Sequence, residues 1–478
     1  MKLVQSFALA LLSVSALLTH ASVTAGRNEK LQVAQPQQHA IQQQQQQHLA
    51  VGPHDVLEHG KKLSDVIAAS PLLSLHRAIC EVESITDNEA AVGKLLVSIL
   101  EAHNFTVVTQ SVPPPPKAAQ STSTSAKKER FNIYAYPDVS KYGGGFTASD
   151  AKPKVLLTSH IDTVPPHIPY SLSLPSKGDE LGGGGAATTS SFSRKDILIS
   201  GRGTVDDKAC VAVQVQTALD LLSDPAAFTS VSPSDIALLF VVGEEKRGDG
   251  MRHFSSSHIY NHTRDHYKAI LFGEPTEGKL AAGHKGIEML SLRARGKAAH
   301  SGYPWLGRSA NSMILPALVV LDKLGDTPEE EGGLPGSDKY GKSTVNVGIM
   351  QGGVAANVVP EFAMADVTFR LAGGTVAEVR KIVTDAVRKV DPEELLDLSF
   401  SQGYGPVPLD ADVDGFETIT VNYGTDVPNL DVVDGVKKYL YGPGSILVAH
   451  GKDEGLTVGD MEEALEGYKK LVMHALKL

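Results

Sequence analysis

The chain has 478 residues, 42% of them hydrophobic and 21% charged, which is enough for two or three domains with a sizeable core. Its formal net charge of −11, with no long basic run, argues against nucleic acid or an anionic membrane as the main partner. After the N-terminal segment, no apolar run reaches the length of a membrane span.

Residues 1–25 resemble a secretory signal peptide. Lys2 gives a positive start, and Phe7 to Leu18 is an apolar run too short to span a membrane, followed by small residues. We therefore expect cleavage after Ala21 or Ala25 and a secreted, soluble mature protein. Two sequons, at Asn104 and Asn261, agree with export and are predicted glycosylation sites.

Residues 26–55 are rich in Gln and lack apolar periodicity, so we expect this segment to be disordered. The chain has two cysteines, Cys80 and Cys210. They could pair in an oxidising compartment, but the sequence does not show that they are close in space. Cys210 lies in an apolar helical run, where a buried free thiol is the alternative.

The region from residue 56 to 285 alternates short apolar runs with helical patterns, which predicts an α/β domain with a mixed, mostly parallel sheet flanked by helices. Ligands of such sheets gather at the carboxyl ends of the strands. The expected elements are a helix over Glu89–His103, strands over Val155–Thr158, Ile236–Val242 and Ala269–Phe272, and a helix over Ala209–Leu222.

Residues 286–400 have a different order of expected strands and helices, which predicts a ferredoxin-like α+β unit with a four-stranded antiparallel sheet and two helices on one face. Residues 401–478 then return to the first domain, so we expect an inserted lid or dimerisation domain. Its expected elements are strands over Glu288–Ala294, Thr344–Met350, Phe362–Leu371 and Leu395–Phe400, and helices over Ser309–Leu324 and Val376–Val390.

Acidic and histidine residues stand at the ends of several apolar runs, each inside a short signature. A buried strand that delivers a charged or imidazole group to the interior needs a partner for that group, and a metal ion is the simplest common partner. Two divalent metals with one free carboxylate as base can hydrolyse an amide bond. The residues and their signatures are His160 and Asp162 in "LLTSHIDTVP", Asp206 in "GRGTVDDKA", Glu244 and Glu245 in "VVGEEKRGDG", Glu274 in "LFGEPTEG" and His450 in "ILVAHGKDE".

The local patterns suggest individual roles. In an extended segment, His160 and Asp162 point to the same side, so Asp162 could orient the imidazole. Asp206 precedes a helix after a Gly-containing turn that could fix a bridging carboxylate; otherwise it is a helix cap, for which Asp207 is the better candidate. One of the adjacent acids Glu244 and Glu245 could bind metal while the other takes a proton from water.

Taken in this order, the signatures resemble the M20 family of metallopeptidases, in particular its secreted fungal carboxypeptidase-like members, from about Leu72 onward. The resemblance implies two zinc ions, one held by His160 and Glu274 and the other by Glu245 and His450. It also implies Asp206 as the bridging ligand, Glu244 as proton acceptor, Asp162 as orienting acid, and a cis peptide between Asp206 and Asp207.

Three residues of the inserted domain match the family as well. His300 in "GKAAHSGYP" resembles the histidine that contacts the substrate and its developing oxyanion, which dimeric relatives supply from the partner's lid. Asn357 and Arg370 resemble the pair that holds the substrate carboxylate, for which the planar guanidinium fork is suited. Many relatives dimerise through this domain; the sequence leaves the oligomeric state open.

The resemblance implies a carboxypeptidase that acts on small peptides. The alternatives are an amidohydrolase acting on N-acyl amino acids, an aminopeptidase, which the inserted domain argues against, and a non-catalytic scaffold, which the complete ligand set argues against. Two features depart from many members: the loop "PPHIPYSLSLP" after His160, and Ala209 where glycine is frequent. The loop puts the substrate preference in doubt, because it could border the pocket.

Overall fold

The computed structural model describes residues 62–114, 129–141, 152–175, 192–223 and 231–478. The predicted signal peptide and the predicted disordered Gln-rich segment lie outside these residues. Within the described part of the chain, no helix is long and apolar enough to cross a membrane.

A mixed six-stranded sheet forms the centre of the first domain, in the order β1-β2-β6-β3-β7-β15. The strands β6, β3, β7 and β15 run parallel to their neighbours in this group, and β2 pairs antiparallel with both β1 and β6. The bounds are β1 Phe105–Ser111, β2 Phe131–Pro137, β3 Val155–His160, β6 Ile236–Val241, β7 Ala269–Gly273 and β15 Lys437–Tyr441. The three predicted strands of this sheet are confirmed.

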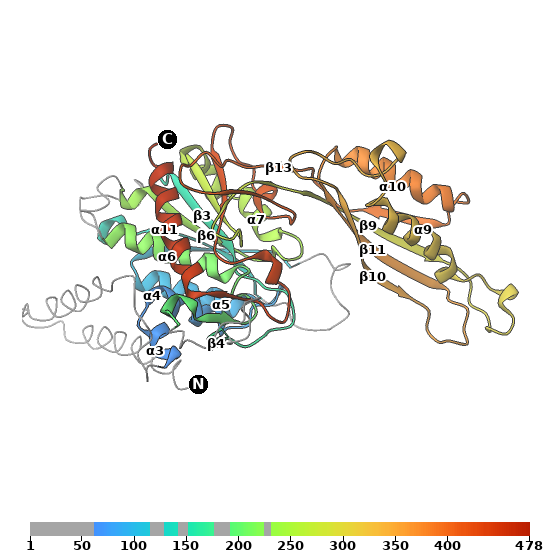
Figure 1. Ribbon diagram of the computed structural model, residues 1–478, viewed down its shortest axis with the longest axis horizontal. Helices are drawn as coiled ribbons and strands as arrows, with labels where there is room; N and C mark the ends of the chain where they lie inside the picture. Colours follow the sequence, from blue (N-terminus) through green and yellow to red (C-terminus); the bar gives the residue numbers. More distant parts are fainter. Residues whose placement is uncertain (1–61, 115–128, 142–151, 176–191, 224–230) are drawn as a thin grey trace, which may run out of the picture. The chain divides into compact units, whose positions relative to one another are not determined.

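Helices cover both faces of this sheet, as predicted. Successive side chains of β3 point to opposite faces of the sheet, and both faces are apolar. Leu157 packs in one apolar core with α4, α5, α6 and α11, whereas Leu156 packs in another with α7 and α8. Complete burial of each such leucine contributes about 2 kcal/mol. The helices are α3 Leu63–Ala68, α4 Pro71–Cys80, α5 Ala90–Ala102, α6 Lys208–Ser223, α7 Asp249–Ser255, α8 His258–Thr263 and α11 Val458–Ala475 (Figure 1).

The second domain has an antiparallel four-stranded sheet in the order β10-β11-β9-β12. Two helices, α9 Ala310–Leu324 and α10 Val376–Val390, pack side by side over its apolar core (Figure 1). The strands are β9 Gly286–Arg295, β10 Thr344–Gly352, β11 Phe362–Leu371 and β12 Leu396–Phe400. The predicted ferredoxin-like unit is therefore present, with bounds within two residues of those expected.

Two small sheets complete the fold: β13-β8-β14, with Val407–Pro408, Leu280–His284 and Thr418–Val421, and β16-β5-β4, with Gly455–Thr457, Leu198–Ser200 and Ser171–Ser173. The first of them lies where the chain enters and leaves the inserted domain. There Ile287 and Tyr404 exchange backbone hydrogen bonds of 2.9 and 3.0 Å, so the two crossings run side by side.

The apolar run before His450, read as a strand, is instead a 3₁₀ turn, Ile446–Val448, in which Leu447 is exposed; short apolar runs need not be buried. Cys80 and Cys210 are both buried free thiols, so the pairing alternative is wrong and the free-thiol alternative holds.

Candidate metal centre

Three neighbouring parallel strands deliver site residues to one edge of the central sheet. His160 is the last residue of β3, Glu244 and Glu245 follow β6, and Glu274 directly follows β7. Because β3 pairs with both β6 and β7, their carboxyl ends meet at the same edge. The alternation of apolar strands and helices therefore brings these side chains together.

Two contacts fix the orientation of the His160 imidazole. Nδ1 donates to the backbone carbonyl of Asp162 at 3.0 Å, which directs Nε2 toward the Asp206 carboxylate, whose Oδ1 lies 3.0 Å away. The predicted orienting contact from the Asp162 carboxylate is the weaker one, since its Oδ1 lies 3.5 Å from Nδ1. The carbonyl of Asp162 therefore does most of the orienting.

The buried carboxylate of Asp162 is occupied by other donors. It accepts hydrogen bonds from the hydroxyl of Thr86 at 2.8 Å and from the backbone amides of Glu244 at 3.1 Å and Glu245 at 3.3 Å. Burial acts to raise the pKa of Asp162, but His160 and these donors lower it overall. Asp162 is thus a charged anchor for the turn that carries both glutamates.

The two carboxylate oxygens of Asp206 face two different histidines. Oδ1 lies 3.0 Å from His160 and Oδ2 lies 3.2 Å from Nε2 of His450. The peptide between Asp206 and Asp207 is cis, as the family resemblance implied. A carboxylate shared in this way between two imidazoles has the arrangement required to bridge two cations.

Glu245 lies beside His450 in the site. Its Oε2 lies 3.0 Å from Nε2 of His450, while its Oε1 is buried and has no hydrogen-bond partner among the described residues. His450 comes from the turn after Ile446–Val448 with a positive φ of 63°, and 52% of its side chain is exposed. The part of the site around His450 is therefore open to solvent.

Glu274 and Glu244 lie beside His160. One ligand atom each from His160, Glu244 and Glu274 lies within 4.8 Å of the others, as do those from His160, Asp206 and Glu245. Burial, followed by the charges of Glu244 and Asp206, raises the pKa of Glu274 well above its usual range; burial likewise raises that of Glu244.

The donor set fits divalent metal ions. Four carboxylates, Asp206, Glu244, Glu245 and Glu274, converge on two imidazoles, and one buried carboxylate oxygen has no partner. Concentrated negative charge of this kind is unfavourable in the protein interior without cations. Nitrogen and oxygen donors in groups of three also suit zinc, which takes such ligands with one position left open.

Asp207 does not cap the following helix with its side chain. Its backbone carbonyl accepts from the amide of Val211 at 3.2 Å, as a cap residue's does, but both carboxylate oxygens are buried without a hydrogen-bond partner in the described part of the chain. Burial raises its pKa to about 7.

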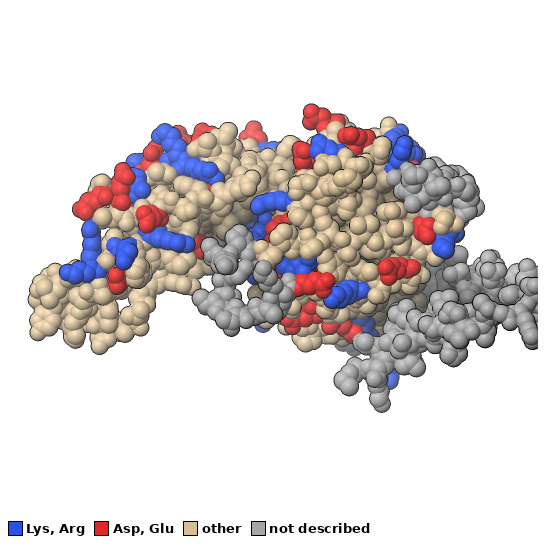
Figure 2. Space-filling view, turned by 180° about the vertical axis from the view of Figure 1, so that it is seen from behind, with Lys and Arg blue, Asp and Glu red and all other residues tan. Residues whose placement is uncertain are grey.

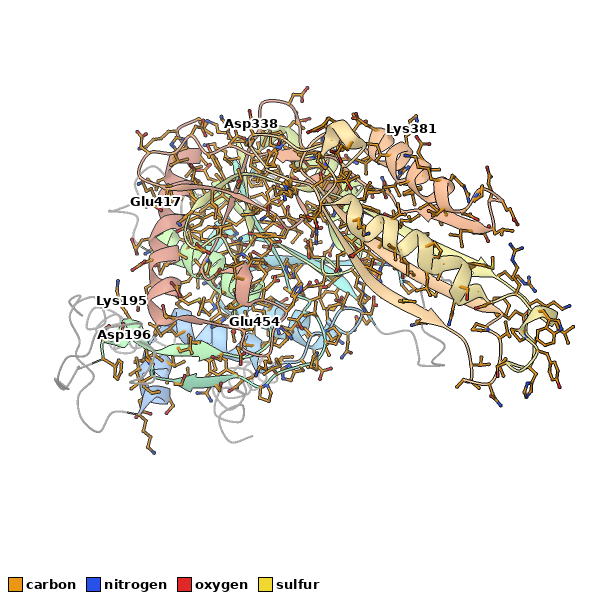
Figure 3. The ribbon with its side chains drawn as sticks, turned by 45° about the vertical axis from the view of Figure 1, so that its right-hand side comes forward. Lys195, Asp196, Asp338, Lys381, Glu417 and Glu454 are labelled. Carbon is orange, nitrogen blue, oxygen red and sulfur yellow. The ribbon has the colours of Figure 1, made fainter. Side chains whose placement is uncertain are left out.

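Two acids at the site escaped the sequence analysis. Glu454, labelled in Figure 3, accepts from the amides of Gly203, Val205 and Asp206 at 2.9 to 3.3 Å and pairs with Arg202 at 2.6 Å, so it holds the Asp206 loop. Because its contacts are with residues about 250 positions earlier in the chain, no local sequence pattern could have revealed it.

The second is Asp426, in "NYGTDVPNL". This buried acid lines a small cavity together with His160, Glu244 and Glu274, and its Oδ2 has no partner among the described residues. Its Oδ1 accepts from Asn429 at 2.8 Å. No apolar strand immediately precedes it, which is why the pattern of strand ends did not reveal it.

The three predicted residues of the inserted domain are not brought together within one chain. His300 and Asn357 are neighbours, since the amide of Ser301 donates to the carbonyl of Asn357 at 2.9 Å. Arg370 lies at the opposite end of β11, and Phe362 to Arg370 alone spans roughly 26 Å at the rise of an extended strand. Within a single chain Asn357 and Arg370 are therefore far apart, and their shared role in holding the substrate carboxylate stays a prediction.

Arg370 lies on the side of the metal centre. Gly424 packs directly against Arg370 and Tyr404. A Cβ atom added to Gly424 would lie 3.1 Å from Nη1 of Arg370 and closer still to the hydroxyl of Tyr404. Burial and the charge of Glu244 raise the pKa of Tyr404, whereas Arg370 lowers it. Tyr404 thus stands within electrostatic reach of both the base candidate Glu244 and the Arg370 guanidinium.

The predicted glycosylation sites lie at the surface. The sequon residues Asn104 and Asn261 are both exposed.

Comparison with known proteins gives a consistent result. Residues 282–394 match the peptidase dimerisation domain of the M20 family. A probable carboxypeptidase of Aspergillus niger is 50% identical over 433 residues, which cover 90% of this chain and 95% of the relative.

Solved structures with low sequence identity share the fold. A tripeptidase from Staphylococcus aureus matches with a TM-score of 0.59 at 19% identity, covering 85% of this chain and 98% of that chain. A metallo-carboxypeptidase of the M20 family from Sulfolobus solfataricus matches with a TM-score of 0.56 at 15% identity, covering 86% and 100%. Because proteins named as a tripeptidase and as a carboxypeptidase share this fold, the fold alone does not fix the substrate.

Proposed function

Since the chain belongs to the M20 family of metallopeptidases, we propose that it is a secreted zinc carboxypeptidase that releases the C-terminal amino acid of small peptides. The observation that carries this proposal is the placement of the Asp206 carboxylate between His160 and His450, with Glu244 beside them. The name of the Aspergillus niger relative supports carboxypeptidase activity in particular.

Two zinc ions fit the donor groups, with Asp206 shared between them. His160 and Glu274 would hold one ion, and Glu245 and His450 the other. When bound, such ions supply Lewis acidity, which polarises an amide carbonyl and makes a water molecule more acidic. The unpartnered Oε1 of Glu245 supports this assignment, because a buried carboxylate oxygen needs a donor or a cation.

Glu244 is the proposed general base. Its carboxylate lies within 4.8 Å of the donor atoms of His160 and Glu274, yet it is not needed to complete either ligand set. Burial and the neighbouring acids Asp426 and Glu245 raise its pKa, which suits a group that takes a proton from water and passes it to the departing amine.

Arg370 is the proposed anchor for the free carboxylate of the substrate. No carboxylate partner of Arg370 is among the ion pairs of the described residues, and the group lies beside Tyr404 on the side of Glu244. A guanidinium binds a carboxylate through two parallel hydrogen bonds. This anchor would restrict cleavage to the last peptide bond.

We propose that His300 and Asn357 act on the active site of a partner subunit, because they lie in loops beyond the Phe362 end of β11, whereas Arg370 lies at its other end. Exposed apolar side chains near them, Tyr303, Trp305 and Leu306, are suited to burial in such a contact. Figure 2 shows, at its lower left, a part of the inserted domain's surface without charged side chains. The match to a peptidase dimerisation domain supports a homodimer.

Export and glycosylation are part of the proposal. The signal-like residues 1–25 support secretion. The exposure of Asn104 and Asn261 leaves both sequons accessible for modification.

The test is a substrate panel given to the purified mature protein. N-blocked dipeptides, the same dipeptides amidated at the C-terminus, and N-acetyl amino acids are each incubated with and without chelator and added zinc. Chelator-sensitive cleavage of the free-acid dipeptides, lost on amidation, is expected. Selective cleavage of the N-acetyl amino acids would instead establish the alternative, an amidohydrolase on the same site. Absence of turnover with both metals bound would overturn the substrate class.

A further inference from the structure

The segment from His253 to His266 contains four of the chain's 17 histidines in a stretch of 14 residues. None of the four belongs to the donor groups of the metal centre. We propose that two of them, His258 and His262 on α8, form a second site for a divalent transition-metal ion, separate from the catalytic pair.

The spacing of the two histidines places both rings on one stripe of the helix. They are four residues apart, which brings side chains on successive helical turns next to each other. Their ring centroids lie 3.9 Å apart with an interplanar angle of 31°, and both residues are exposed. Two histidines at this spacing on one helical face form a recurring zinc-binding element.

The tautomer of His262 suits coordination. Its Nδ1 lies 3.2 Å from the backbone carbonyl of His258, so Nδ1 carries the proton and Nε2 presents its lone pair away from the backbone. The ring nitrogens of His258 make no hydrogen bond to another described residue, and its ring contact is with His262. Nε2 of His262 and both ring nitrogens of His258 therefore make no hydrogen bond within the described residues.

The rings need only a small opening to share one ion. With zinc–nitrogen bonds of about 2.1 Å at a tetrahedral angle, the two ring centroids would be about 5 Å apart. That is about 1 Å more than the separation in this structure, which rotation of two exposed side chains supplies. Water would fill the remaining positions, so the site is an accessible one with a lower affinity than the buried centre.

Other nearby histidines do not share this arrangement. His266 follows His262 by four residues, but the chain crosses the 3₁₀ turn Arg264–His266, where each residue advances by about 120° instead of about 100°. No ring contact joins His266 to His262 in the described structure. His266 is therefore a matched control on the same surface segment.

The experiment is calorimetric titration of Zn²⁺ into enzyme whose catalytic sites are already loaded. Wild type should bind one further equivalent, and His258→Asn and His262→Asn should each weaken this binding at least tenfold, whereas His266→Asn should not change it. Peptide hydrolysis should be unaffected in all three variants, which are surface substitutions away from the buried core.

Absence of a further saturable equivalent would overturn the proposal, as would equal Zn²⁺ binding in the two His variants. The readout is metal binding and not turnover, so it stands whether or not the carboxypeptidase assignment survives its own test.

Discussion

The backbone amide of Glu244 donates a 3.1 Å hydrogen bond to Oδ1 of Asp162, two residues beyond the metal-ligand candidate His160. The next amide, that of Glu245, donates to Oδ2 of the same carboxylate at 3.3 Å. One buried acid therefore fixes the position of the base candidate and of a ligand candidate together, and its carbonyl fixes His160. The turn after β6 and the end of β3 are held as one unit through Asp162.

We expect Asp162→Asn to lower kcat by about 10- to 100-fold, the usual cost of losing a residue that supports metal ligands. Asparagine keeps the shape but has one acceptor oxygen, so it cannot serve both amides and the Thr86 hydroxyl. Steady-state kinetics and zinc content measure the effect. Thr86→Val, which removes one of the three donors to Asp162, should cost less; equal effects of the two variants would contradict the anchoring role.

Substitution of the adjacent glutamates should separate the roles of base and ligand. Glu244→Gln should remove turnover while zinc content stays at two per chain, because only the proton acceptor is lost. Glu245→Ala should instead lower zinc content, since it deprives His450 and Asp206 of a co-ligand. Elemental analysis beside kinetics distinguishes them. Loss of zinc from Glu244→Gln would make Glu244 a ligand, which its position within 4.8 Å of His160 and Glu274 also permits.

The fold was largely predictable because the central strands β3, β6 and β7 are fully buried, whereas the strands of the inserted domain alternate. The run Ile236–Val241 could hardly be anything but a central strand, and the antiparallel sheet of the inserted domain has strict alternation, as in Phe362–Leu371. The strand ends then identified His160, Glu244, Glu245 and Glu274 as neighbours. His450 was included on the same argument, but its own apolar run is an exposed turn and not a strand.

What the sequence could not supply was the set of contacts between distant loops. Asp426 reaches the site from a loop without an apolar strand immediately before it, and Glu454 acts through backbone amides of residues about 250 positions away, which no local pattern reveals. The separation of Asn357 from Arg370 was equally hidden, because it depends on the direction of β11 and on which end faces the metal centre.

Mixed dimers should reveal whether His300 acts on its partner. His300→Ala and Glu244→Gln homodimers should both be inactive or nearly so. If the two are co-assembled in equal amounts, half the dimers are mixed and one of two sites in each is intact, so about a quarter of the wild-type activity should return. Activity of the separately purified and mixed proteins measures this.

Arg370→Ala mixed with Glu244→Gln provides the control for this experiment. Because Arg370 is proposed to serve its own subunit's site, the mixed dimer would lack an intact site and no activity should return. Recovery in this control, or no recovery with His300→Ala, would contradict the assignment of the two ends of β11 to different active sites.

Asp426→Asn should move the acidic limb of the kcat/KM–pH profile to lower pH. The charge of Asp426 is among the causes that raise the pKa of Glu244, after burial, so its removal lowers that pKa and leaves the base deprotonated in more acidic solution. Asp431→Asn, an exposed acid five residues further on, should leave the profile unchanged. A shift of the Asp426→Asn profile to higher pH would show that Asp426 does not act through its charge on Glu244.

The last prediction concerns His76, whose ring is completely buried beneath the Asp206 loop. Its Nε2 lies 3.0 Å from the carbonyl of Thr204, and its Nδ1 has no partner among the described residues. Burial lowers its pKa from 6.5 to about 4. Between these values the unfolded chain binds a proton that the folded protein does not. Stability is therefore fully present above pH 6.5 and is lost as the pH falls toward 4, by roughly 3 kcal/mol.

Urea unfolding across this pH range measures the effect against a variant that cannot titrate. His76→Gln retains a donor for the Thr204 carbonyl, so its free energy of unfolding should fall less steeply with decreasing pH than that of wild type. The surface variant His266→Gln should parallel wild type. Because the comparison is between slopes, acid-induced metal loss common to all three proteins cancels. Parallel curves for His76→Gln and wild type would mean that His76 accepts a proton without unfolding the loop that carries Asp206.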